Sequence, residues 1–145
     1  MSRLMMLAVT CVTSLIVVEL RAAEESRGQR MFEGRWTNVN KENPGVTRLE
    51  IKAGEKAATL QAWGKCSPED CDWGATTLHL LGNTVSDRDL PYGFASWDHR
   101  FKVAHMTLRI EKGVLVAELF DIFTDDSGRS NFRSIHRFRR TPAAK

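Results

Sequence analysis

The sequence predicts an all-β domain in which eight antiparallel strands form an up-and-down barrel. Three observations support this fold class. From Gly34 onward, apolar and polar residues alternate with a period close to two, which is the pattern of half-buried strands. Short polar turns, several of which end in glycine, separate the alternating segments. A meander of this length would leave two exposed edges, and closure into a barrel removes both of them.

Each expected strand is bounded by a turn signal. The segment KENPG ends the first strand, and AGEK separates the second from the third. The polar connection at residues 82–93 is the longest and is expected to be a surface loop. In the strand at 101–110, alternation places Ala104, Met106, Leu108 and Ile110 toward the interior. The expected strands are residues 34–40, 46–52, 57–63, 75–81, 94–98, 101–110, 114–123 and 129–140.

Residues 1–23 have the features of a secretory signal peptide. Arg3 precedes an uncharged segment, residues 4–18, that is shorter than the roughly 20 residues needed to span a bilayer. The small residues Ala22 and Ala23 follow, as expected for a cleavage site. We therefore expect a secreted or periplasmic protein with no transmembrane span in the mature chain. The mature chain would comprise a linker at 24–33, the barrel domain at 34–140 and a tail at 141–145.

The charge of the expected mature chain is nearly balanced. Cleavage would remove Arg3, Arg21 and Glu19, leaving 19 basic and 17 acidic residues of the original 21 and 18. Such a balance argues against a nucleic-acid partner. The basic residues concentrate at 133–140, where charges in an alternating strand are typical of a solvated face. An anionic partner is the alternative interpretation of that segment.

The segment WGKCSPEDCDWG, residues 63–74, is almost symmetric about its centre. After cleavage only Cys66 and Cys71 remain, and an even number of cysteines in an oxidising compartment predicts a disulfide. A zinc site needs about four ligands, and no histidine has a spacing that completes one. A redox-active dithiol favours two residues between the cysteines, whereas four lie here. We expect a disulfide, no metal and no cofactor.

The segment FEGRWTNVN, residues 32–40, resembles the opening strand of the calycin superfamily, which includes lipocalins and avidins. Gly34 and Trp36 match the Gly-x-Trp motif of those families. The resemblance implies that Trp36 closes one end of the barrel and that a basic residue of the last strand, Arg137 or Arg139, packs over its ring. In avidin-type sequences the asparagine that follows Trp-Thr points into the pocket, which implies the same role for Asn38.

The segment at residues 63–74 is similar to the hallmark of a group of small secreted or envelope domains that carry Trp-Gly-x-Cys-x-Pro-x-Asp-Cys-Asp-Trp-Gly. The similarity extends from about residue 34 to residue 74. It implies a barrel architecture and an exported location, and it implies no particular activity.

Function depends on whether the barrel is filled, because eight strands enclose either packed side chains or one small ligand. No motif of a hydrolase, metalloprotease or phosphate-binding enzyme occurs, so we do not expect an enzyme.

The alternative to a small-molecule site is a protein-binding module of the cell envelope or a secreted protease inhibitor, acting through a loop rim that contains Glu69 and Asp70. We expect the rings of Trp63 and Trp73 to share one face. The expected ligand-binding residues are Asn38, Asn40, Trp63, Trp73, Tyr92 and Trp97.

Overall fold

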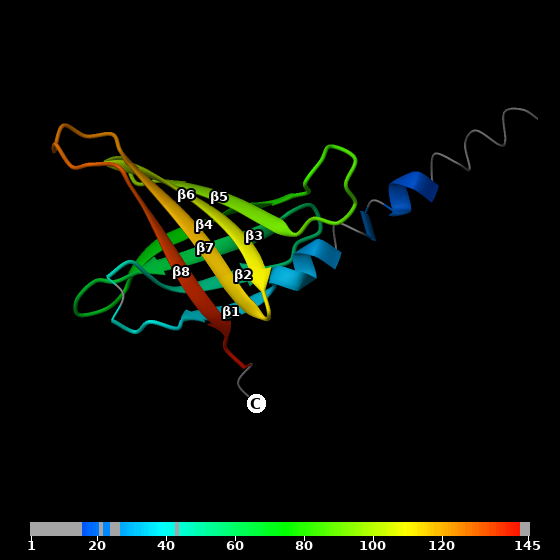
Figure 1. Ribbon diagram of the computed structural model, residues 1–145, viewed down its shortest axis with the longest axis horizontal. Coiled ribbons are helices and arrows are strands. Elements are labelled where there is room, and N and C mark those ends of the chain that lie inside the picture. Colours follow the sequence, from blue (N-terminus) through cyan, green and yellow to red (C-terminus); the bar gives the residue numbers. More distant parts are fainter. Residues whose placement is uncertain (1–15, 21, 24–26, 43, 143–145) are drawn as a thin grey trace, which may run out of the picture.

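The computed structural model describes residues 16–20, 22–23, 27–42 and 44–142. Each strand pairs antiparallel with the next, and β8 returns to pair with β1, so the sheet is a closed barrel (Figure 1). The predicted fold class is thereby confirmed. The strands are β1 (Gly34–Asn38), β2 (Val46–Lys52), β3 (Ala58–Gly64), β4 (Cys71–Leu81), β5 (Tyr92–Asp98), β6 (Lys102–Glu111), β7 (Val114–Phe123) and β8 (Phe132–Arg140).

Strand β4 begins earlier than the sequence predicted. It starts at Cys71, which pairs with Gly64 of β3, instead of at residue 75. The disulfide-bearing connection is therefore a short loop between two paired strands. The cavity described below opens beside this loop.

Apolar side chains fill most of the barrel interior. Alternation along β6 buries Ala104, Met106 and Leu108, as the sequence predicted. The same alternation along β7 buries Leu115, Ala117 and Leu119. Other fully buried core side chains come from β1, β2, β3, β4 and β8 and include Trp36, Leu49, Ile51, Leu60, Leu78 and Phe138.

Trp36 and a short helix at residues 27–32 close one end of the barrel (Figure 1). The indole Nε1 of Trp36 donates a hydrogen bond of 2.8 Å to the carbonyl oxygen of Phe32, whose side chain is fully buried. Phe32 belongs to the segment that the sequence suggested as a linker, residues 24–33. This segment therefore contributes a buried side chain to the barrel.

The arginine over Trp36 is Arg140, so the prediction of Arg137 or Arg139 is wrong. The Arg140 guanidinium carbon lies 4.6 Å from the centre of the Trp36 ring, and Arg140 pairs with Trp36 in the strand register. Its Nη1 and Nη2 atoms donate to the carbonyl oxygens of Glu33 and Met31, at 2.6 and 2.9 Å. Alternation explains the correction, because the even-numbered side chains of β8 turn inward and the odd-numbered ones turn outward.

Most of the expected signal peptide, residues 1–23, and most of the expected tail, residues 141–145, lie outside the described residues. Among the helices that the structure describes, none has the length and apolarity required to cross a membrane.

Candidate functional site at the open end

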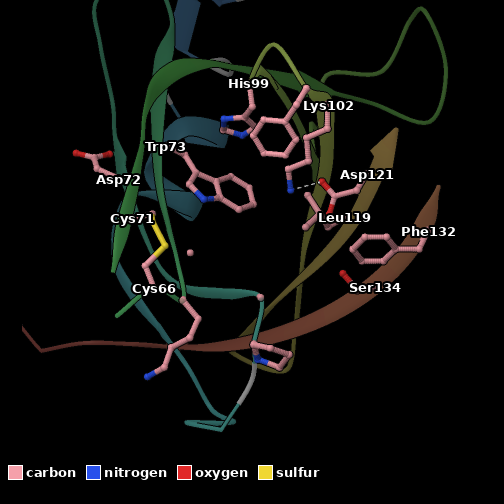
Figure 2. A pocket seen from close by; sticks show the side chains of 15 residues that line it. Cys66, Cys71, Asp72, Trp73, His99, Lys102, Leu119, Asp121, Phe132 and Ser134 are labelled. Carbon is pink, nitrogen blue, oxygen red and sulfur yellow. Dashed lines mark ion pairs between the residues drawn. A yellow bond between two sulfur atoms is a disulfide. The ribbon is translucent and has the colours of Figure 1, made fainter. Parts of the chain in front are cut away.

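A cavity of about 410 Å³ lies at the end of the barrel opposite the 27–32 helix. It is bounded by the β3–β4 loop, the β5–β6 turn and the neighbouring ends of β7 and β8 (Figure 2). Figure 2 shows Trp73 and the disulfide on one side, with the Lys102–Asp121 ion pair across from them. The lining side chains include Trp73, His99, Phe101, Lys102, Leu119, Asp121, Phe132 and Ser134.

Trp73 forms the aromatic wall of the cavity. Its ring makes edge-to-face contacts with Trp97, at 5.8 Å between centroids, and with His99, at 5.1 Å. A Cβ atom on Gly64 would lie only 2.6 Å from the Trp73 Nε1 atom, so this packing requires a glycine there. The Trp97 Nε1 atom donates to the carbonyl oxygen of Gly74 at 3.0 Å. The two glycines of the near-symmetric segment therefore support the partly buried Trp73 and the buried Trp97.

Trp63 and Trp73 lie on opposite faces of the sheet, which contradicts the expectation that they share one face. Trp63 pairs with Asp72, whereas Gln61 pairs with Ala75, so β4 contains one extra residue at this point. Gly74 accommodates this bulge with a φ of +80°, a conformation that glycine adopts readily. The bulge leaves Trp63 on the outer face and turns Trp73 toward the interior.

A buried ion pair lies beside the aromatic wall. The Nζ atom of Lys102 is 2.7 Å from Oδ1 of Asp121, and the two side chains are 15% and 3% exposed. The same Nζ atom lies 5.0 Å from the centre of the Trp73 ring. Asp121 Oδ1 has no well-directed hydrogen bond within the described part of the chain, so its contact with Lys102 is ionic. Asp121, which lines the cavity, thus has a buried carboxylate oxygen that is held by an ion pair and keeps a lone pair able to accept a hydrogen bond.

Two histidines flank this ion pair. Burial lowers the pKa of His99 below its ordinary value of 6.5, and the nearby Lys102 charge lowers it further, against the opposing effect of Asp121. Burial also lowers the pKa of His136, again against Asp121. Both shifts favour the neutral form of the ring. Nε2 of His99 is buried and has no hydrogen-bond partner among the described residues, whereas Nε2 of His136 lies 2.9 Å from the Ser134 hydroxyl.

We expect the free energy of unfolding to fall as the pH drops below 6.5, the ordinary histidine pKa. Below that value the unfolded chain binds protons that the folded chain, with its lowered pKa values at His99 and His136, does not bind. Melting temperatures measured from about pH 8 to about pH 5 test this dependence. The His136→Gln variant should show a shallower loss of stability in this range, and an unchanged profile would contradict the assignment.

The disulfide between Cys66 and Cys71 is present, which confirms that prediction, and its Cα atoms are 5.4 Å apart. The Thr47 hydroxyl donates a hydrogen bond of 2.7 Å to Oδ2 of Asp70 and so ties the disulfide loop to β2. Glu69 is exposed on the loop. No group of metal-ligating side chains converges within the ranges that the structure describes. The loop thus forms a covalently closed edge of the cavity.

Replacement of both cysteines by serine should lower the free energy of unfolding by about 2 kcal/mol, because the small loop gains conformational freedom in the unfolded chain. Urea unfolding of the Cys66→Ser/Cys71→Ser variant measures this effect. The wild-type protein unfolded under reducing conditions should give the same loss. Equal midpoints for the oxidised, reduced and doubly substituted proteins would contradict the prediction.

Four of the six expected ligand-binding residues are not among the residues that line this cavity or form its tryptophan pair. Asn38 donates from Nδ2 to the Val46 carbonyl oxygen at 2.6 Å and accepts from the Asn40 backbone N–H at 2.9 Å. Both asparagines therefore hold the β1–β2 connection. Tyr92 begins β5 at the closed end and is 38% exposed, and Trp63 lies on the outer face. The structure brings only Trp73 and Trp97 together at the cavity.

Sequence reasoning missed His99, Lys102 and Asp121. The strand alternation contained a signal for Lys102 and Asp121. Lys102 is in phase with the interior residues Ala104 and Met106, and Asp121 is in phase with Leu119. A charged residue at an interior position of a barrel strand is costly unless it is paired. The two charges can therefore be recognised as candidate partners from the sequence pattern alone.

Comparison of the chain with family models, curated proteins and solved structures finds no match. The closed eight-stranded barrel is compatible with the calycin-like architecture that residues 32–40 implied. Membership of that superfamily, and of the group with the Trp-Gly-x-Cys hallmark, stays a prediction.

Proposed function

We propose that this chain is an exported module that binds a small molecule in the cavity at the open end of its barrel. The observation that carries the proposal is a pair of buried polar atoms beside the cavity: His99 Nε2, which has no hydrogen-bond partner within the described residues, and Asp121 Oδ1, which is held by its ion pair with Lys102 and has no well-directed hydrogen bond there. Buried polar groups are nearly always paired in folded proteins. A ligand that hydrogen bonds to both atoms would satisfy them.

The lining chemistry favours a neutral or zwitterionic ligand with a flat apolar part. Lys102 and Asp121 carry opposite charges, so a ligand with a net charge would gain one contact and be repelled by the other partner. Trp73 supplies an apolar wall for a ring. The volume of about 410 Å³ lies within the range of small-ligand sites. No metal or cofactor is part of this proposal.

Export is supported by two independent features. The Cys66–Cys71 disulfide is of a kind that persists in oxidising compartments and is rare in the cytosol. The pattern of residues 1–23 is typical of a secretory signal peptide. Both features support the proposed secreted or periplasmic location.

A thermal-shift screen tests the proposed function. Panels of amino acids and their amides, aromatic heterocycles and neutral sugars cover the expected ligand chemistry. A compound present at about 100 times its dissociation constant adds about 2.7 kcal/mol of stability, which corresponds to a rise of on the order of 10 °C in the melting temperature. We expect the shift to be lost in Asp121→Asn, which keeps the volume of the side chain and removes the charge.

The matched control is Glu118→Gln on the same strand. Glu118 faces outward and pairs with Arg133, so this substitution removes a carboxylate without touching the cavity. The compound should stabilise Glu118→Gln and wild type equally. A compound that stabilises Asp121→Asn as strongly as wild type binds outside this cavity, and that result would contradict the proposal.

A protein partner is the second candidate, and exposed aromatic residues favour it. Phe101 and Phe132 lie at the rim of the cavity and are 42% and 50% exposed. Exposed apolar side chains that gather at a rim are typical of interaction surfaces. The compound screen separates the two candidates, because the absence of any thermal shift would favour the rim as the functional surface.

A further inference from the structure

We propose that the outer face of β8, β1, β2 and β3 binds an acidic polysaccharide, at a site separate from the cavity at the open end. The strand register places four outward side chains in one row across these strands. Arg139 pairs with Thr37, Thr37 with Arg48, and Arg48 with Trp63. These strands are consecutive neighbours in the closed barrel (Figure 1).

A groove of about 360 Å³ follows part of this row. The hydroxyl oxygens of Thr37 and Thr141 lie 2.8 Å apart within it, and both residues are exposed. Hydroxyl groups of this kind both donate and accept, as the hydroxyls of a sugar do. The groove therefore combines hydrogen-bonding groups with the flanking cations. Its lining residues are Arg35, Trp36, Thr37, Arg48, Leu49, Glu50, Trp63 and Thr141.

Arg48 is held in place without a direct ion pair among the described residues. Its guanidinium carbon lies 4.4 Å from the centre of the Trp63 ring, a cation–π contact that restricts the side chain. No carboxylate forms an ion pair with Arg48 within the described ranges. A guanidinium that is already ordered and still has free N–H donors loses little entropy when it binds a carboxylate or sulfate.

The remaining charges leave a surplus of positive charge on this face. Arg139 is exposed and, in the part of the chain that the structure describes, has no ion-pair partner. Glu50 is held by Arg35 at 3.1 Å and by Lys52 at 3.5 Å, and these contacts lower its pKa. Asp72, at the far end of the row, accepts hydrogen bonds from Gln61 Nε2 and the Gly74 backbone N–H. Neither carboxylate forms a direct ion pair with Arg48 or Arg139, although the nearby Arg48 charge contributes to the lowered pKa of Asp72.

The spacing of the cations favours an extended ligand. Arg139 and Arg48 are separated by β1, so their backbones lie about 10 Å apart, twice the distance between neighbouring strands. Arg48 lies over the Trp63 ring, on the strand side away from Arg139, so a chain of sugars with repeated acidic groups suits both cations and places hydroxyls against Thr37. Arg48 covers one face of the Trp63 ring, which disfavours the base stacking that single-stranded nucleic acids use.

Calorimetric titration with a size-defined polygalacturonate oligosaccharide tests this inference. We expect binding that weakens as the salt concentration rises, because exposed charge pairs are screened. Arg48→Gln and Arg139→Gln should each weaken binding about fivefold. The matched control is Arg133→Gln on the outer face of β8, since Arg133 is already paired with Glu118. That control should bind within about twofold of wild type.

Three results would overturn the inference. The first is unchanged affinity in the Arg48→Gln/Arg139→Gln double variant. The second is equal binding of a neutral glucan of the same length. The third is tighter binding to a single-stranded DNA oligomer or to anionic phospholipid vesicles than to polygalacturonate. Circular dichroism of each variant confirms that the barrel has folded. Compounds that bind the open-end cavity in the thermal-shift screen should stabilise the double variant as much as wild type. A failure of this inference can therefore be distinguished from a failure of the proposed function.

Discussion

Lys102→Met is expected to lower the free energy of unfolding by about 3 kcal/mol, because it leaves the Asp121 carboxylate buried without its cation. Asp121 is 3% exposed, and Lys102 supplies its only ion pair within the described residues. The value is at the low end of the range for a broken buried pair, since Lys102 keeps 15% of its side chain exposed. Urea unfolding monitored by tryptophan fluorescence measures the loss.

A second substitution distinguishes an unpaired charge from lost packing. Lys102→Met combined with Asp121→Asn removes both charges, so we expect it to recover at least about 1 kcal/mol relative to the single variant. Arg133→Met, which breaks an ion pair on the outer face, should cost only about 0–1 kcal/mol. A double variant that is less stable than Lys102→Met would show that packing, not charge pairing, dominates at this position.

Trp36→Ala is expected to cost about 3–5 kcal/mol, the range for removing a large aromatic side chain from a core. Trp36 is 2% exposed, donates to the Phe32 carbonyl oxygen and carries the Arg140 guanidinium over its ring. Its loss would open the closed end of the barrel and leave that carbonyl unpaired. Thermal and urea unfolding of the purified variant give the magnitude.

Trp63→Ala is the matched control for this prediction. Trp63 has the same side chain but lies half-buried on the outer face, so its removal should cost about 1 kcal/mol. If the two tryptophan variants lost equal stability, the account of Trp36 as the residue that closes the barrel would be wrong.

The fold was predictable because strand alternation and turn chemistry are local signals. The interior face of β6, for example, could be assigned from the positions of Ala104, Met106 and Leu108. The same rule, applied to β8 by counting two residues forward from inward-facing Phe138, gives Arg140 as the partner of Trp36. The resemblance to the Gly-x-Trp families indicated an arginine in this strand, and only the register selects which one.

The site was harder to predict, because one inserted residue changes the face on which a side chain lies. Trp63 and Trp73 occupy similar positions in a near-symmetric sequence, yet the bulge at Gly74 sends their rings to opposite faces. Sequence spacing alone does not locate such a bulge. Lys102 and Asp121 lie on the paired strands β6 and β7, and their inward phase indicates them as partners, but the sequence does not show the cavity that they border together with Trp73.

Binding at the open end can be read from the indole N–H signals of the four tryptophans in a nitrogen-15 NMR titration. Trp73 lines the cavity and Trp97 contacts Trp73, whereas Trp36 closes the opposite end and Trp63 lies on the outer face. With a compound from the thermal-shift screen, we predict that the Trp73 signal moves most and the Trp97 signal next. The Trp36 and Trp63 signals should stay in place. Saturable binding that moves the Trp63 signal and leaves the Trp73 signal unchanged would contradict a ligand site in this cavity.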